Sequence, residues 1–493
     1  MKLYYKLFTL IILSTALGSC KRYLDIAPIS NQSTNNFFKS ESDIDQALAG
    51  VYNALLPFPD VNNYNLSECH TNNYIIASVD AQRDYFTINH FDVTPLMGTI
   101  EASWTNSYKL VGRANQILDV IDNITFLDDT KRLREKSEAR FLRAYAYFEL
   151  VKLFGAVPLI DHMVTSAESL NYGRTSADSI YNFIIAELQD AADGLPYKYA
   201  NAADAGRVTK LAAWGLLGKA HMFLAGYPYK KSDHYQTAQT ILKKVLDQEN
   251  VNWKFAPTYA ELFKAANDNK YHLFEVQYIV GGQGYGSPIP GEVVPNDLTT
   301  SLLPYGVYYI QGAPSRDLIN SYEPGDKRMF ATIDTLYRNK TNVWTRRDWV
   351  RKFLDSSVAA TTKTNSDWPV NFPLLRSEEV MLLYAEAVNE TSGPTTEAVA
   401  ILNRIRSRAG LPAVTPANAT DFRLAMEKER RHEFAWEGLY WFDLVRTNRF
   451  LDVLNPFLTT NYQKSIDANK CLYPVPQPEI NIKPGLYGQN NGY

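Results

Sequence analysis

The stretch that most constrains the fold runs from Glu427 to Thr447 and reads EKERRHEFAWEGLYWFDLVRT. Its first half is dense in acids and bases, and from Phe434 onward its apolar residues would cover every face of a helix. A helix that is apolar all round is a buried helix. We therefore predict a single buried helix here, about 30 Å long and close to the width of a domain.

Charged residues within this stretch require partners. Glu433, Glu437 and Asp443 would lie inside the predicted helix or along its margin, and an unpaired buried charge costs several kcal/mol. We expect three arginines of the same stretch to pair with these acids and to fix how neighbouring helices dock: Arg430, Arg431 and Arg446. A catalytic acid and base is the alternative, because Glu433 and Glu437 are four residues apart on one predicted face. We favour the structural interpretation.

The same stretch resembles a family signature. ERRHEFAWEGLYWFDLVR is similar to the signature near the C-terminus of the SusD/RagB family of outer-membrane nutrient-binding lipoproteins. Further blocks resemble the family in order along the chain: CKRYLDIAP, WTNSYKLVGRANQIL, SEARFLRAYAYFELVKLFGAVPLI, PSRDLINSYEPGDKR, WVRKFLD, FPLLRSEEVMLLYAEAV and YPVPQPEINIKPGLYGQNNGY. The resemblance extends to the last residue, and the prolines of the final block predict an extended tail that wraps back over the fold.

Residues 1–19 have the features of a lipoprotein signal peptide. Two lysines precede the apolar run from Leu7 to Leu17, which is too short to span a bilayer. The run ends in Leu-Gly-Ser-Cys, which looks like the bacterial lipobox, so we expect Cys20 to be acylated and to anchor the chain. An ordinary secretory signal with an incidental cysteine is the alternative.

Composition excludes one broad class of partner. The chain has 493 residues, of which 45% are hydrophobic and 21% charged, and its formal net charge is −3. This balance argues against nucleic acid, which requires a basic face. We expect a helical N-terminal region over 20–250 and a C-terminal region over 251–493. Cys69 and Cys471 could form one disulfide or remain thiols.

Apolar residues recur at helical spacing in seven segments. The segments are 42–56, 104–121, 138–154, 179–195, 207–225, 378–389 and 396–409. Trp214, Leu217, Gly218 and His221 follow a tetratricopeptide-like pattern, and small residues at Ala238 and elsewhere would let paired helices approach closely. We predict a mainly α fold: a tetratricopeptide-like helical repeat frame, like the SusD α-α superhelix, with long irregular binding loops.

Two long stretches, 58–100 and 281–314, lack this spacing but are rich in aromatic, Asn and Gly residues. Loops of this length are usually functional or disordered, and embedded aromatics argue against disorder. An aromatic ring can pack on the apolar face of a sugar while Asn, Asp and Arg bind its hydroxyl groups. The predicted ligand contacts are Tyr74, Asp80, Arg83, Tyr85, Tyr285, Tyr305 and Tyr308. For any one of these aromatics, packing of the loop onto the frame is the alternative.

Enzyme motifs are absent from the sequence. It has no G-x-S-x-G, P-loop or H-E-x-x-H motif, and no two of its seven histidines are four residues apart. The run GGQGYG at 281–286 lacks the spacing of a dinucleotide loop. We therefore predict no catalytic residue, no cofactor and no metal site.

The family resemblance implies a function. It implies a non-catalytic glycan-binding lipoprotein, lipid-anchored at the surface of the outer membrane, which delivers oligosaccharides to a SusC-type TonB-dependent transporter by moving as a lid. Peptide capture, as in the RagB branch, is an alternative within the family. A tetratricopeptide scaffold of the envelope and a glycosidase using Glu433 and Glu437 are alternatives from other classes.

Overall fold

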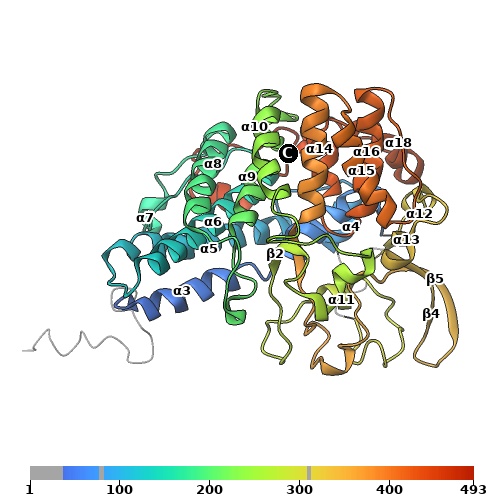
Figure 1. The fold of residues 1–493 in the computed structure, drawn as a ribbon, viewed down its shortest axis with the longest axis horizontal. Coiled ribbons are helices and arrows are strands. Elements are labelled where there is room, and N and C mark those ends of the chain that lie inside the picture. Colours follow the sequence, from blue (N-terminus) through green and yellow to red (C-terminus); the bar gives the residue numbers. More distant parts are fainter. Residues whose placement is uncertain (1–36, 77–82, 308–311) are drawn as a thin grey trace, which may run out of the picture.

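The computed structural model describes residues 37–76, 83–307 and 312–493. The predicted signal peptide, the Cys20 anchor site, Asp80 and Tyr308 lie outside these ranges. Helices dominate the described chain, and Figure 1 shows most of them side by side across the upper part of the molecule. A second region, below them in that view, consists of loops, short helices and three small sheets.

The helical frame is built from successive packed helices. Its members are α3 (Glu41–Asn53), α5 (Gly98–Leu118), α6 (Asp129–Phe154), α8 (Ala177–Gly194), α9 (Lys210–Ala225), α10 (His234–Leu246), α14 (Ser377–Ser392), α15 (Thr396–Arg408) and α16 (Ala419–Glu433). Each packs on the next in space, and α10 packs directly on α14 although residues 247–376 separate them in sequence. The predicted mainly α, repeat-like frame is confirmed.

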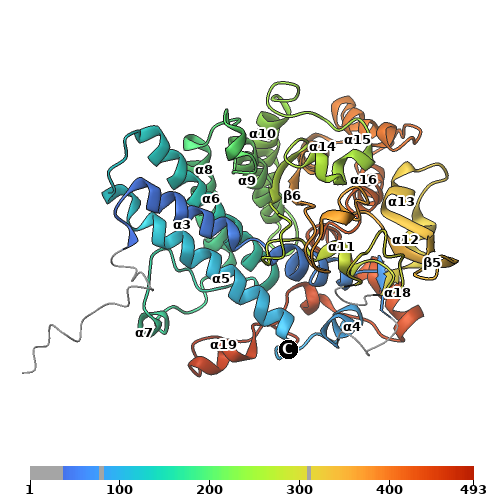
Figure 2. The ribbon, with the colours of Figure 1, turned by 90° about the horizontal axis from the view of Figure 1, so that it is seen from below.

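The remaining elements lie partly in this second region and partly at the edges of the helical frame (Figure 1 and Figure 2). The short helices are α4 (Arg83–Asn89), α7 (Ser166–Ser169), α11 (Ile289–Glu292), α12 (Arg316–Ser321), α13 (Lys327–Thr332), α17 (Tyr440–Arg446), α18 (Phe450–Tyr462) and α19 (Gln477–Ile482). The antiparallel strand pairs are β1 (Tyr74–Ile75) with β3 (Ala313–Pro314), β2 (His272–Val276) with β6 (Phe372–Arg376), and β4 (Ile333–Arg338) with β5 (Trp344–Val350). The β4–β5 hairpin projects from the body in Figure 1.

The predicted single helix over 427–447 is wrong. Helix α16 ends at Glu433 and α17 begins at Tyr440, with a buried turn between them. Trp436 and Gly438 have φ angles of 66° and 74°, so both leave the right-handed helical region. A Cβ on Gly438 would lie 2.4 Å from the Asn63 backbone, so the turn packs directly on the first long loop. The turn is as buried as the two helices that it joins. Its residues are apolar because they are buried, and not because they form a helix.

Two further boundaries differ from the predictions. The stretch 58–100 is not irregular throughout: it contains a π-helical turn (Pro59–Asn65), helix α4 and the start of α5. Helix α6 begins nine residues before the predicted 138, because Asp128 caps it by accepting a hydrogen bond from the Thr130 amide. Its first turns are polar, so apolar periodicity does not reveal them.

The C-terminal tail packs against the frame. The Tyr473 amide donates to the Leu153 carbonyl at 2.8 Å, and the Gln477 amide donates to the Pro95 carbonyl at 2.8 Å. Helix α19 interrupts the predicted extended path and lies against α5, as Figure 2 shows. The tail therefore returns over the frame as predicted, with one helical turn in place of a continuous extended chain.

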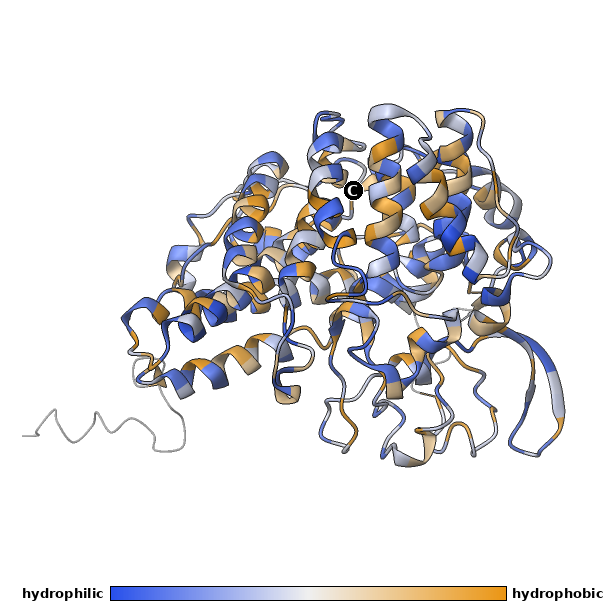
Figure 3. Cartoon of the chain, in the orientation of Figure 1, coloured by the Kyte–Doolittle hydropathy of each residue, from blue (hydrophilic) through white to orange (hydrophobic). Residues whose placement is uncertain are grey.

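A continuous apolar core joins both regions. Figure 3 shows apolar residues concentrated where the helices face one another and polar residues on their outer faces. In the described ranges, no helix combines the length and apolar character needed to cross a bilayer.

Candidate functional site

The loop that carries Tyr285 is held in shape by one carboxylate. The backbone amides of Gly281 and Gly282 donate to Asp367 at 3.0–3.1 Å, and the Lys363 amide donates to it at 2.9 Å. Gly282 has a φ of 68°, which an L side chain rarely adopts. Tyr285 is 45% exposed at the end of this anchored loop.

A second exposed tyrosine is tied to the same support. Tyr305 is 53% exposed, while Leu303, two residues before it, is buried and anchors its loop. The Asn365 side chain donates to the Val307 carbonyl at 3.1 Å. Both tyrosine loops therefore attach to residues 363–368, which fixes them relative to each other.

Tyr74 and Tyr85 occupy a different environment. Tyr74 is 1% exposed, shares a hydrogen bond with the Tyr64 hydroxyl at 2.9 Å, and meets the Trp436 ring edge-on. Tyr85 is 8% exposed, and burial raises its pKa well above the usual range. Both rings pack the first loop onto the core, so neither presents a face to a ligand in this conformation. Of the predicted tyrosines described so far, Tyr285 and Tyr305 are the two that are exposed enough to contact a ligand.

The remaining predicted contacts cannot be compared with these. Asp80 and Tyr308 lie in the ranges that the structure leaves out, and of Arg83 only its backbone position at the start of α4 is described. Cys69 and Cys471 are free thiols, so they form no disulfide with each other. Within the described ranges, no three His, Cys, Asp or Glu side chains gather as metal ligands would.

Two buried carboxyl groups lie beneath the loops. Asp60 and Glu292 are neighbours, and the Asn65 amide donates to Asp60 at 2.7 Å. Burial raises the pKa of both carboxyl groups, that of Asp60 to about 6, and the proximity of Asp60 raises the pKa of Glu292 further. The pair therefore favours holding a proton, as two carboxyl groups without a cation do.

Glu433 and Glu437 belong to a buried ion network. Glu433 accepts from Arg376 at 2.5 Å, from Arg328 at 3.2 Å and from Arg408. Glu437 accepts from Lys352 at 2.7 Å and from Arg376 at 2.6 Å. These ion pairs tie the end of α16 to α13, β6 and α15, elements that are separated from one another along the sequence.

Electrostatics argue against an acid and base at this position. Burial opposes ionisation of Glu433, but the guanidinium groups of Arg408, Arg376 and Arg328 outweigh it and hold its pKa below the usual range. A general acid requires a raised pKa and access to the substrate. Glu433 and Glu437 are at most 2% exposed and lie on different sides of the turn after α16. They do not share one helical face, and their positions suit a structural role in place of acid and base catalysis.

The three arginines of the signature stretch are also paired with carboxylates, but one of them finds its partner outside the stretch. Arg430 pairs with Asp443 at 2.8 Å, and Arg446 pairs with both Asp443 and Glu386 at 2.8 Å. These pairings confirm the prediction for Arg430 and Arg446. Arg431 instead reaches out of the stretch, to Asp317 at 2.5 Å and to Asn73 at 2.8 Å. It links α16 to α12 and to the first loop.

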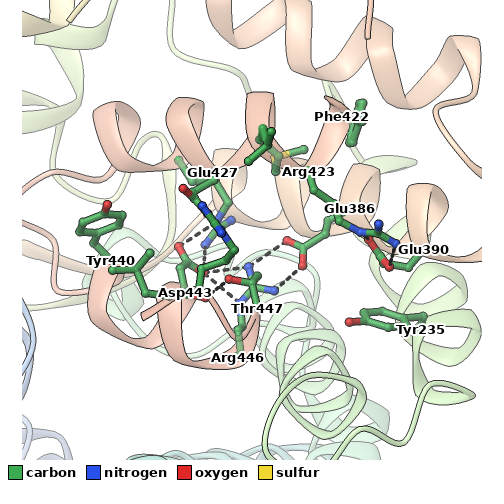
Figure 4. A pocket seen from close by; sticks show the side chains of 15 residues that line it. Tyr235, Glu386, Glu390, Phe422, Arg423, Glu427, Tyr440, Asp443, Arg446 and Thr447 are labelled. Atoms are coloured by element: carbon green, nitrogen blue, oxygen red, sulfur yellow. Dashed lines mark hydrogen bonds and ion pairs between the residues drawn. The ribbon is translucent and has the colours of Figure 1, made fainter. Parts of the chain in front are cut away.

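A cavity of about 210 Å³ lies beside this network, between α10, α14, α16 and α17. Figure 4 shows charged side chains that converge around it, with Arg446 bonded to Glu386 and Arg423 to Glu390. Each of these guanidinium groups is already held by a carboxylate. The cavity is thus walled by ion pairs that clamp the helices together, and neither Tyr285 nor Tyr305 is among the residues that line it (Figure 4).

The sequence matches known protein families over most of its length. Residues 333–493 match the family model described as the SusD family, and residues 22–222 match the one described as starch-binding, associating with the outer membrane. SusD-like protein P2 of Formosa agariphila is 26% identical over 99% of both chains. The chain belongs to the SusD/RagB family. In this chain the signature stretch near the C-terminus carries part of the ion network just described.

Solved structures agree with the SusD/RagB fold. A SusD superfamily protein from Parabacteroides distasonis has a TM-score of 0.80 at 24% identity, with 91% of this chain and 99% of that chain covered. A laminarin-binding SusD-like protein has a TM-score of 0.78 at 24% identity, with 92% and 100% covered. At these identities the likeness establishes the fold alone.

Sequence reasoning missed two features in or near the candidate site. Asp367 anchors the Tyr285 loop, and Trp344 lies 57% exposed near the tip of the β4–β5 hairpin. A signal for the hairpin was present: the polar turn Asn339–Asn342 separates two segments rich in β-forming residues. Asp367 has no local signal as an anchor of this loop, because Gly281 and Gly282 lie more than 80 residues away from it.

Proposed function

We propose that this chain is a non-catalytic glycan-binding lipoprotein of the cell surface, and that Tyr285 and Tyr305 stack on sugar rings. The observation that carries the proposal is the pair of half-exposed tyrosines on loops anchored to one segment, 363–368. Rigid aromatic platforms bind sugars without the entropic cost of ordering a loop. A family model described as starch-binding and a laminarin-binding neighbour support the ligand class.

We further propose that Cys20 anchors the chain in the outer membrane and that it delivers glycan to a SusC-type TonB-dependent transporter. The family match described as associating with the outer membrane supports the location. The long ordered loops argue against a bare repeat scaffold, which would have short connections. Cys20→Ala should move the protein from the outer-membrane fraction to the soluble fraction.

Affinity electrophoresis through gels that contain defined polysaccharides tests the ligand class. We expect retardation by at least one glycan, with no shortening of the polysaccharide. Tyr285→Ala with Tyr305→Ala should weaken that retardation about tenfold or more, since each stacking ring contributes roughly 1 kcal/mol. Tyr197→Ala is the matched control, because Tyr197 is 38% exposed on the helical frame.

Three outcomes would count against the proposal. Unchanged retardation of the double variant would remove the tyrosines from the site. Retardation by no glycan, together with calorimetric binding of peptides, would favour the RagB-like alternative. Glycan shortening that Glu437→Gln abolishes would favour a glycosidase.

A further inference from the structure

The β4–β5 hairpin is joined to the loop that carries Tyr305. The Thr299 amide donates to the Arg338 carbonyl at 2.9 Å, and the Lys340 amide donates to the Asp297 carbonyl at 2.8 Å. The Tyr337 hydroxyl also donates to the Asp297 carboxylate at 2.6 Å. The hairpin is therefore hydrogen-bonded to the start of the segment that leads to Tyr305.

One face of this hairpin combines an indole ring with two guanidinium groups. Arg338 is the cross-strand partner of Trp344, and Leu336 is the partner of Arg346. Cross-strand partners and residues two apart point to the same side, so these four side chains share a face. The Arg338 guanidinium lies 4.8 Å from the Trp344 ring centre, and Trp344 remains 57% exposed.

The positive charge of the hairpin is not neutralised by its own acids. Residues 333–351 contain five basic and two acidic residues. Both acids are already used: Asp334 pairs with Arg351 at 3.0 Å and Asp348 with Arg316 at 2.7 Å. Four exposed cations have no carboxylate within ion-pair distance in the described part of the chain: Arg338, Lys340, Arg346 and Arg347.

This local excess is unusual within the chain. The protein as a whole has a net charge of −3, and buried arginines such as Arg376 and Arg446 are paired with carboxylates. Surface cations left unpaired beside an exposed indole are typical of a surface that meets an anion and an apolar ring together.

We propose that the hairpin face formed by Leu336, Arg338, Trp344 and Arg346 binds anionic sugar units, so that the glycan taken by this chain carries carboxylate or sulfate groups. This inference rests on the proposed glycan-binding function. The indole stacks on a sugar ring, and the guanidinium groups donate charge-assisted hydrogen bonds to its anionic substituents. Both anions accept such bonds from the planar guanidinium group.

A glycan fits this face better than an anionic lipid surface. The hairpin is hydrogen-bonded to the Tyr305 loop, so an extended chain of sugars can contact Tyr305 and Trp344 in one bound conformation. A lipid surface would require cations alone and would not use the neighbouring tyrosines. Continuity with the tyrosine loops therefore favours the glycan.

Affinity electrophoresis and calorimetry of the purified full-length chain in detergent test the inference. The probes are polygalacturonate for carboxylate, carrageenan for sulfate, laminarin as a neutral glycan, and vesicles of phosphatidylglycerol in phosphatidylcholine for lipid. We expect one anionic glycan to bind more tightly than laminarin, with affinity that falls as salt rises.

Arg338→Gln with Arg346→Gln should weaken binding of that anionic glycan about tenfold, because two charge-assisted contacts are lost. Binding of any neutral glycan should stay unchanged. The matched control removes two positive charges from the frame, Arg132→Gln with Lys243→Gln, and should leave both affinities unchanged. Arg338→Lys with Arg346→Lys keeps the charge but not the planar fork, and should recover only part of the affinity. All hairpin substitutions are at exposed positions, and thermal unfolding checks that each variant folds.

The outcomes separate this inference from the proposed function. If neutral glycan binds as well as anionic glycan, or the hairpin variant matches the frame control, the inference is wrong and the proposed function stands. If no glycan binds, both fail. Binding to phosphatidylglycerol vesicles without binding to either anionic glycan would assign the hairpin to lipid and overturn the inference.

Discussion

Arginine side chains serve different purposes in two regions of this protein. In the signature network Arg376 is 2% exposed and bonded to Glu433 and Glu437. On the hairpin Arg346 is exposed, and among the described residues it meets no carboxylate. A buried arginine must be paired because desolvation is costly, whereas an exposed one stays hydrated and free to meet a ligand. Burial therefore separates the arginines that hold the fold from those available for recognition.

Arg376→Ala should produce the largest effect on stability. It removes the cation shared by Glu433 and Glu437 and leaves buried carboxylates short of a partner. We expect the free energy of unfolding to fall by about 3–5 kcal/mol, measured by chemical denaturation. A loss below 1 kcal/mol would show that the network contributes little, and would remove the contrast with the hairpin.

Glu275→Gln should produce an intermediate, pH-dependent effect. Burial raises the pKa of Glu275 to about 8, with nearby Asp268 adding to the shift, and no lysine or arginine among the described residues pairs with it. Because the folded pKa lies above the ordinary value of 4.5, its contribution to stability is complete below pH 4.5 and is lost as pH rises toward 8. The glutamine variant has no such loss, so it should gain about 3 kcal/mol relative to wild type between pH 5 and pH 8.

Denaturation of wild type and variant at the two pH values measures this gain. Glu433 is the useful comparison, since three guanidinium groups lower its pKa despite equal burial. A Glu275→Gln difference that is the same at both pH values would mean that burial does not raise this pKa.

Arg346→Ala should produce the smallest effect on stability. Its side chain is exposed and makes no ion pair with a described residue, so the free energy of unfolding should change by less than about 0.5 kcal/mol. The same denaturation experiment that measures Arg376→Ala checks it. A large loss would show that Arg346 is structural and would weaken the proposed anionic contact.

Much of the frame was predictable because the spacing of apolar residues within a segment indicates a helix. Apolar spacing predicted both ends of α3, α8, α9, α14 and α15 to within three residues, whereas α5 and α6 begin six and nine residues before their predicted starts. The first turns of α6 after Asp128 are polar. The turn at Gly438 was not predictable, because the Asn63 backbone that requires a glycine there is distant in sequence.

The candidate site was likewise predictable from the sequence only in part. Tyr285 and Tyr305 were predicted from their glycine-rich and aromatic surroundings and are exposed on anchored loops, where their contact with a ligand stays a prediction. Tyr74 was also predicted from its place in a long loop, but it packs against Tyr64 and Trp436. Nothing local distinguishes these tyrosines, because exposure depends on what the rest of the chain places above each ring.

The sequence by itself determined the family, the helical frame and the need for charge pairing in the signature stretch, since these depend on local spacing and on the cost of buried charge. Only the tertiary structure decided which partner each charge takes and which aromatic rings face outward. Arg431 found Asp317 rather than its own stretch, and the hairpin carrying Trp344 joined the Tyr305 loop. Such contacts join residues far apart along the chain, and their formation depends on packing that no short segment encodes.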